Sequence, residues 1–199
     1  MKKIVILAAA LTAFIAAEAV AQMQEIAQAG PFRHVGSNTV FPEQVGAYER
    51  GKVVKLDDPA GENVAIGYQG KPPGGPVVLM EFVYPPWPPG GQGSRESHCQ
   101  ADFDASKAAI DKYADARKLG ESIPPPMAGV PAGLSHQATY TFSAEFDGKP
   151  VTLQTDVVLY CYVARNWFVK YRATSPLGSD LRASLNEFIT TTGPWPGRK

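Results

Sequence analysis

The amino-acid sequence predicts an α+β fold, an antiparallel sheet with two main helices packed on it. Two observations support this: short segments alternate apolar and polar residues, and two longer segments space their apolar residues as helices do. Strands come first, then a helix, three more strands and a second helix, an order typical of α+β proteins. We expect one domain at residues 45–191, after an extended lead-in at 22–44 and before a C-terminal tail at 192–199.

Three strands are predicted before the first helix. A strand is predicted at residues 45–57, and a second at residues 63–69, where apolar and polar side chains alternate. Residues 77–84 are strongly apolar and end at a proline pair, which indicates a well-buried strand. The Pro-Pro-Gly-Gly sequence at 72–75 predicts a hairpin turn between the last two.

The first helix is predicted at Asp102–Leu119, a segment rich in Ala, Asp and Lys. Its apolar residues Phe103, Ile110 and Tyr113 are spaced for one buried face. Gly120 follows at a position suited to a helix C-cap. The triple proline at 124–126 then predicts an extended linker.

A three-stranded meander is predicted next, at residues 137–146, 151–163 and 167–173. The dipeptide Asp147-Gly148 between the first two strands is a strong hairpin signal. A second helix at about residues 179–191 closes the domain. Its apolar stripe consists of Leu181, Leu185, Phe188 and Ile189.

This order of elements resembles the PsbP-like α/β sandwiches, a group that includes many exported bacterial proteins of unknown role. The resemblance is carried by the Asp102–Leu119 helix, the Asp147-Gly148 hairpin, the Trp167–Arg172 strand and the last helix. A cystatin-like sheet would have a similar order. The resemblance implies an exported α/β sandwich and assigns no site residue.

The first 21 residues predict a cleavable signal peptide. Lys2 and Lys3 precede an uncharged apolar run at 4–17, and Ala19-Val20-Ala21 is a cleavage pattern that would make Gln22 the first mature residue. The alternative is an uncleaved anchor, but the run is shorter than the ~20 residues that cross a bilayer as a helix. We therefore expect a periplasmic or secreted protein with no membrane span after cleavage.

The balance of charge argues against a nucleic-acid partner. The chain has 19 basic and 19 acidic residues, and the signal peptide contains two of the former and one of the latter, so the mature charge is −1. Nucleic-acid binding requires a dense basic surface, which this composition does not supply.

The two cysteines, Cys99 and Cys161, predict a structural disulfide, because an even count in an oxidising compartment favours pairing. Two separate buried thiols are the alternative. No metal site is predicted, since His98, Cys99, Asp102 and Asp104 lack the paired spacing of structural zinc ligands. No cofactor is predicted. Gly-x-Ser-x-Gly is absent from the sequence, and no catalytic residue is assigned.

One face of the meander is the predicted ligand or partner surface. A three-residue turn at 164–166 would pair Tyr162 with Phe168 and Tyr160 with Lys170, opposite the face of Leu159, Cys161, Trp167 and Val169. Cross-strand packing under a covering helix is the alternative. Trp87, between prolines, is a further candidate because a rigidly held Trp loses little entropy on binding. The predicted surface comprises Tyr160, Tyr162, Phe168, Lys170, Arg172 and Trp87.

These observations favour an exported, non-catalytic binding or accessory protein of the bacterial envelope, whose partner is an envelope protein or a small ligand. The alternative is a small periplasmic enzyme, hydrolase-like, with a site assembled from scattered polar residues. A purely structural accessory subunit is the third possibility. A deep pocket with convergent ionisable groups would favour the enzyme, and an open aromatic surface would favour the binding protein.

Overall fold

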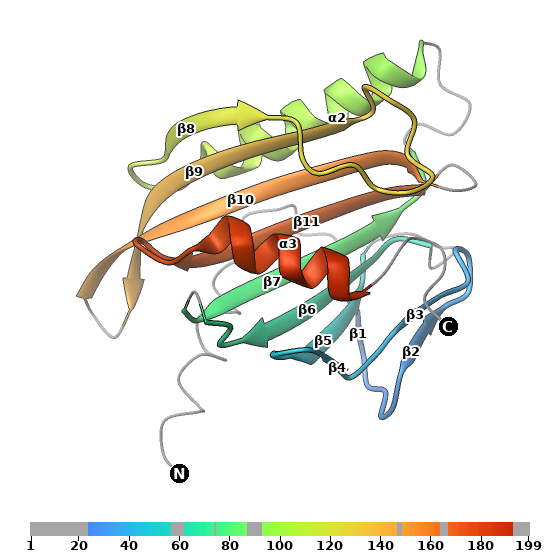
Figure 1. The fold of residues 1–199 in the computed structure, drawn as a ribbon, viewed down its shortest axis with the longest axis horizontal. Helices are drawn as coiled ribbons and strands as arrows, with labels where there is room; N and C mark the ends of the chain where they lie inside the picture. Colours follow the sequence, from blue (N-terminus) through green and yellow to red (C-terminus); the bar gives the residue numbers. More distant parts are fainter. Residues whose placement is uncertain are drawn as a thin grey trace.

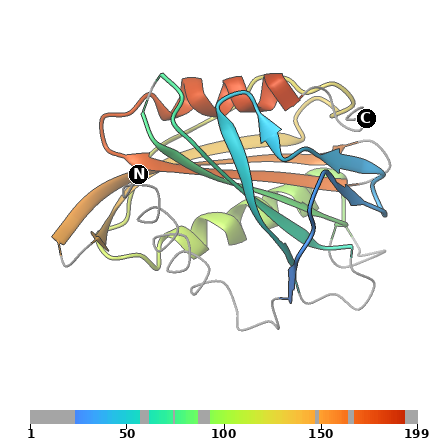
Figure 2. The ribbon, with the colours of Figure 1, turned by 90° about the horizontal axis from the view of Figure 1, so that it is seen from below.

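Two helices cover opposite faces of one large sheet in the computed structural model (Figures 1 and 2). The structure describes residues 24–56, 62–73, 75–86, 93–146, 149–163 and 167–192. Helix α2 (Arg95–Ile110) lies on one face and helix α3 (Leu181–Thr192) on the other. The predicted α+β class, an antiparallel sheet with two packed helices, is therefore confirmed.

The strands near the N-terminus and the C-terminal meander form one antiparallel sheet of nine strands. The predicted strand at 77–84 is confirmed as β7, and it pairs with the last strand, β11, so that Val83 lies opposite Val169. Short strands also occupy the predicted lead-in. The strand order is β1 (Gln24–Ile26), β5 (Tyr48–Lys55), β6 (Val64–Gly70), β7 (Val77–Tyr84), β11 (Trp167–Pro176), β10 (Lys149–Val163), β9 (Ser135–Phe146) and β8 (Arg117–Ser122), with β4 (Gln44–Val45) paired to β5 and a separate pair of β2 (Phe32–His34) and β3 (Thr39–Phe41).

Helix α2 begins and ends earlier than predicted. It begins after Ser94, whose hydroxyl accepts a hydrogen bond from the backbone N–H of Ser97 and caps the first turn. It ends at Ile110, and Asp115 follows with a left-handed φ of 55°. The predicted helical residues after 116 instead form the edge strand β8, where their backbone groups bond to β9. Gly120 lies in β8, so its predicted role as a helix C-cap is wrong.

A β-bulge at residues 161–162 changes the register between β10 and β11. Val163 lies opposite Trp167 as the predicted turn requires, but Tyr160 lies opposite Val169 instead of Lys170. The extra residue is accommodated by Tyr162, which has a left-handed φ of 56°. The predicted faces of β11 relative to β10 are therefore wrong, because a shift of one residue moves every side chain to the other face.

The two faces carry separate hydrophobic cores. Under α3, Phe188 packs edge-on against Tyr48 and Tyr68, with ring centroids 5.1 and 4.9 Å apart, and Leu181 and Leu185 are also buried. The predicted stripe of the last helix is thus confirmed, with Ile189 partly buried. Under α2, the core comprises Cys99, Phe103, Ile110, Leu134, Ala138, Tyr140, Val157, Leu159, Cys161 and Phe168.

Candidate functional site

The predicted surface residues of the meander divide between the two faces of the sheet. Tyr160 lies in the core under α3, whereas Phe168 belongs to the core under α2. Tyr162, Lys170 and Arg172 also lie on the α2 side, so the expected cluster of five on one face is wrong. The bulge at 161–162 is the reason, since Cys161 and Tyr162 both point toward α2. Trp87 lies outside the described residues.

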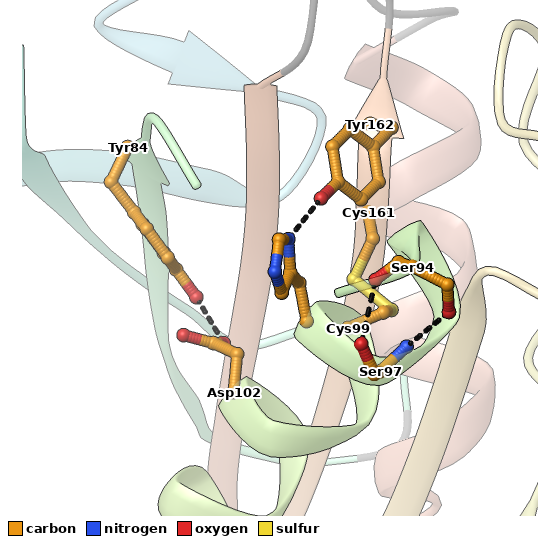
Figure 3. Close-up of a disulfide and its surroundings, with 8 residues drawn as sticks. Tyr84, Ser94, Ser97, Cys99, Asp102, Cys161 and Tyr162 are labelled. Atoms are coloured by element: carbon orange, nitrogen blue, oxygen red, sulfur yellow. Dashed lines mark hydrogen bonds between the residues drawn. A yellow bond between two sulfur atoms is a disulfide. The ribbon is translucent and has the colours of Figure 1, made fainter. Parts of the chain in front are cut away.

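A disulfide joins the first turns of α2 to the end of β10 (Figure 3). Cys99 and Cys161 are 0% exposed, and their sulfur atoms are 2.04 Å apart. The predicted pairing is confirmed. Because both sulfurs are inaccessible to solvent, the bond has the character of a structural link and not of an exchanging one.

Tyr162 is held by contacts beside this disulfide. Its hydroxyl shares a hydrogen bond of 2.9 Å with Nδ1 of His98, and the guanidinium of Arg95 lies 5.0 Å from its ring centroid. The ring also packs edge-on against Phe168. A left-handed backbone costs a non-glycine residue about 1–2 kcal/mol, and these contacts offset that strain.

The two predicted cations on this face are engaged within the protein. Lys170 Nζ lies 4.8 Å from the centroid of Phe82 and donates a hydrogen bond of 3.3 Å to Ser106 on α2. Arg172 is 8% exposed and lies over the ring of Tyr113. Such contacts favour the alternative of cross-strand packing under a covering helix. Direct ligand contact by these residues stays a prediction.

The opposite face holds a pocket of about 250 Å³ beside α3. One wall is α3, and the other is part of residues 123–134, which connect β8 to β9 and which we term the proline strap. The floor is Tyr160 from β10. The lining residues are Pro125, Pro126, Met127, Ala128, Tyr160, Asn186, Ile189 and Thr190, and we term this cavity the α3 pocket.

Hydrogen bonds hold the proline strap over the sheet. The Tyr160 hydroxyl donates a bond of 2.9 Å to the carbonyl of Pro125, and the N–H of Cys161 donates one of 2.9 Å to the carbonyl of Leu134. Burial raises the pKa of Tyr160 to about 12, so its hydroxyl keeps the proton that makes this bond. The triple proline favours an extended backbone, which suits a segment that crosses the sheet without pairing to it.

The walls of the α3 pocket are largely apolar. Among the described residues that line it, Tyr160 alone has an ionisable side chain. The Asn186 side-chain amide has no hydrogen-bond partner within the described residues, so both its donors and its acceptor are available to a ligand. Thr190 donates its hydroxyl to the carbonyl of Asn186, 2.7 Å away.

A polar patch adjoins the α3 pocket one turn earlier along α3. The carboxylate of Asp156 is 0% exposed and accepts hydrogen bonds from Thr139, at 2.5 Å, and from Gln137, at 3.3 Å. Burial raises the pKa of Asp156, an effect partly opposed by the bond from Thr139 and by the charge of Arg182. Arg182 is exposed, its Nη2 lies 3.5 Å from the hydroxyl oxygen of Thr139, and it forms no ion pair within the described residues.

A second, more polar cavity of about 400 Å³ lies near the N-terminal strands, between Gln28, Glu43, Glu49 and Arg50. The Arg50 guanidinium donates bonds of 2.6 Å to the carbonyls of Phe41 and Gly30, and Glu43 accepts from the N–H of Gly30. These bonds attach the segment before β5 to the sheet, which is a structural role.

The described residues contain no group of three His, Cys, Asp or Glu side chains that could bind a metal ion. Within the same ranges, no helix has both the length and the apolar character to cross a membrane.

The sequence predicted Tyr160 as part of an open surface of the meander and gave no indication of the pocket that it lines. Three segments far apart in the chain form the pocket, and the strap was interpreted only as an extended linker. One local signal was available. Asn186, Ile189 and Thr190 follow an i, i+3, i+4 spacing that predicts a shared face of α3, beside the buried stripe.

Comparisons with known proteins identify no family for this chain. No known family's sequence pattern matches it, and no curated protein matches it. Among solved structures it is similar to LpqN, described as involved in cell envelope biogenesis of Mycobacterium tuberculosis, with a TM-score of 0.33 and 12% identity over 84% of this chain and 88% of that chain. None of these comparisons links the chain to the PsbP-like proteins.

Proposed function

We propose that the mature chain is a non-catalytic binding protein of the bacterial envelope that binds a small ligand in the α3 pocket. The observation that carries this proposal is the pocket itself, a largely apolar cavity lined by the half-buried amide of Asn186. Ligand sites are typically concave, mostly apolar and equipped with a few well-placed polar groups. The α3 pocket has this composition, in a smaller volume of about 250 Å³.

The expected location outside the cytoplasm is part of the proposal. The predicted signal peptide supports export, and the buried Cys99–Cys161 bond suits an oxidising compartment. Cytosolic proteins rarely keep such a bond, because cellular reductants maintain their thiols.

The chemistry of the α3 pocket favours binding over the hydrolase-like alternative. A general acid or base works best with a pKa near the operating pH. Burial raises the pKa of Tyr160 to about 12, which makes its phenol a poor proton acceptor or donor for catalysis at neutral pH. The amide of Asn186 can orient a ligand but cannot exchange a proton with it.

A variant that fills the α3 pocket tests the proposal. Ala128 is exposed and lines the pocket, so Ala128→Trp should occupy the cavity while changing stability by about 0.5 kcal/mol or less. Mature protein would be equilibrated with an envelope extract, re-isolated and analysed by mass spectrometry for small molecules. We expect a retained compound that Ala128→Trp loses.

Ala108→Trp, at an exposed position on α2, is the matched control and should retain the compound. Retention of the same compounds by all three proteins would show that the α3 pocket is not the binding site, and it would overturn the proposal.

A further inference from the structure

We propose that the ligand of the α3 pocket is a medium-chain fatty acid, bound with its carboxylate at Arg182 and Asn186 and its alkyl chain between α3 and the proline strap. This inference rests on the proposed function and adds a chemical class of ligand. Three features of the described residues carry it: an exposed cation without an ion pair (Arg182), an adjacent amide with no protein hydrogen-bond partner (Asn186), and a largely apolar pocket with two prolines in its wall.

The carboxylate site lies on one side of α3. Arg182 and Asn186 are four residues apart, so their side chains are neighbours on the helix surface. A guanidinium and an amide N–H₂ on adjacent turns can together donate to both oxygens of one carboxylate. Arg182 is available for this role because its contact with Thr139 is long, at 3.5 Å.

The alkyl site begins one turn further along the helix. Ile189 and Thr190 line the α3 pocket, and Thr190 lies about 12 Å from Arg182 along the helix axis. A linear molecule about 12 Å long would therefore reach along α3 from Arg182 to the pocket, whose floor is Tyr160.

The proline strap favours an alkyl chain over a peptide. Pro125 and Pro126 have no backbone N–H, and the carbonyl of Pro125 already accepts from Tyr160. A peptide along these two prolines would find no backbone N–H donor for its carbonyls, and each carbonyl buried without a partner costs about 1–3 kcal/mol. An alkyl chain has no such groups and gains from burial alone.

Asp156 is the carboxylate that opposes an anionic ligand. It lies beneath α3 and, if charged, attracts Arg182 and repels a second carboxylate. Its bonds from Thr139 and Gln137 satisfy it without Arg182, so the guanidinium remains able to turn toward the ligand. Removing this charge with Asp156→Asn should therefore tighten the binding of a fatty acid.

Calorimetric titration of the mature protein with decanoate, below its micellar concentration, tests the inference. Arg182→Gln should lower the affinity for decanoate about tenfold. It should leave the affinity for decanol, which has the same chain without the charge, unchanged. Arg117→Gln, at an exposed arginine on the edge strand β8, is the matched control and should bind both like the wild type. Asp156→Asn should bind decanoate several-fold more tightly.

Equal decanoate affinities for Arg182→Gln and Arg117→Gln, or decanol binding as tight as decanoate, would overturn the fatty-acid inference. So would tighter binding of an acidic peptide than of decanoate. The proposed function would survive these outcomes if Ala128→Trp still lost the compound retained from the envelope extract. The proposed function would be contradicted, independently of the fatty-acid inference, if Ala128→Trp retained that compound.

Discussion

The two faces of the sheet are covered in different ways. On the α2 face a disulfide fixes the helix, and the cations Arg95, Lys170 and Arg172 lie over aromatic rings. On the α3 face the helix is held by packing and by a hydrogen bond of 2.9 Å from the Tyr48 hydroxyl to the carbonyl of Ser184, and a pocket remains between it and the proline strap. Both faces thus stabilise the fold through a buried core, the α2 face adds a covalent link, and the α3 face is the one to which we assign the proposed ligand site.

The largest expected effect is the loss of the covalent link on the α2 face. Replacing both Cys99 and Cys161 by Ala should lower the free energy of unfolding by about 4 kcal/mol, because the bond constrains a loop of 62 residues in the unfolded chain. Urea denaturation of the variant and the wild type measures this loss.

Ligand binding in the α3 pocket should persist in the double variant under conditions where it is folded. A loss of stability below about 1 kcal/mol would contradict the role assigned to the disulfide, since removing a native disulfide from a small secreted domain typically costs 2–5 kcal/mol.

Tyr160 and Tyr162 are two residues apart in β10 but point to opposite faces of the sheet because of the bulge between them. Tyr160→Ala removes a fully buried ring and the bond to Pro125, so it should cost about 3 kcal/mol or more. Tyr162→Ala removes a half-buried ring and also relieves little strain, since Ala is nearly as disfavoured at positive φ, so it should cost about 1 kcal/mol.

Denaturation midpoints give both values, and amide hydrogen exchange of the proline strap gives an independent readout. Exchange at the amides of Val130 and Leu134, which donate hydrogen bonds within the strap, should accelerate in Tyr160→Ala and not in Tyr162→Ala. Similar costs for the two variants would contradict the different burial of the two rings.

The smallest expected effect is on how the free energy of unfolding changes with pH, which should differ between Asp156 under α3 and His136 on the α2 side. Because burial raises the pKa of Asp156 above its ordinary value of 3.8, the folded state binds this proton more tightly than the unfolded state. Stability from this group is therefore greatest below the ordinary pKa and is lost as pH rises through the folded pKa. Asp156→Asn should remove that loss, which denaturation at several pH values measures.

His136, on the α2 side, should change the stability with pH in the opposite direction, and it therefore serves as an internal control. Burial lowers the pKa of His136 below 6.5, so the folded state prefers the neutral ring, which stacks on Phe103 at 5.0 Å. Stability from this group is present above pH 6.5 and is lost as pH falls through the lowered pKa. His136→Gln should flatten that decline, whereas a steeper decline would contradict the assignment.

The sequence predicted elements whose signals are local. The strand at 77–84 and the stripe of Leu181, Leu185 and Phe188 follow from periodicity, and the disulfide follows from cysteine count and compartment. The start of α2 had a local signal as well, the Ser94 cap, which the apolar spacing further along the helix obscured.

The faces of β11 could not be predicted in the same way. They depend on one extra residue at the bulge, and Tyr162 adopts its left-handed backbone only because His98, Arg95 and Phe168 support it from other elements. The α3 pocket is non-local for a related reason. Its walls come from residues near 125, 160 and 190, and no periodic pattern relates these positions.

The strand β8 has a consequence for the behaviour of the protein at high concentration. It forms one outer edge of the sheet, and an edge strand can template unwanted pairing with another chain. Arg117, Lys118 and Glu121 are exposed along it, and a register shift between Lys118 and Gly120 distorts its pairing. A second molecule that paired with this edge would have to desolvate charged side chains on an irregular strand. These features disfavour the pairing of two molecules along β8.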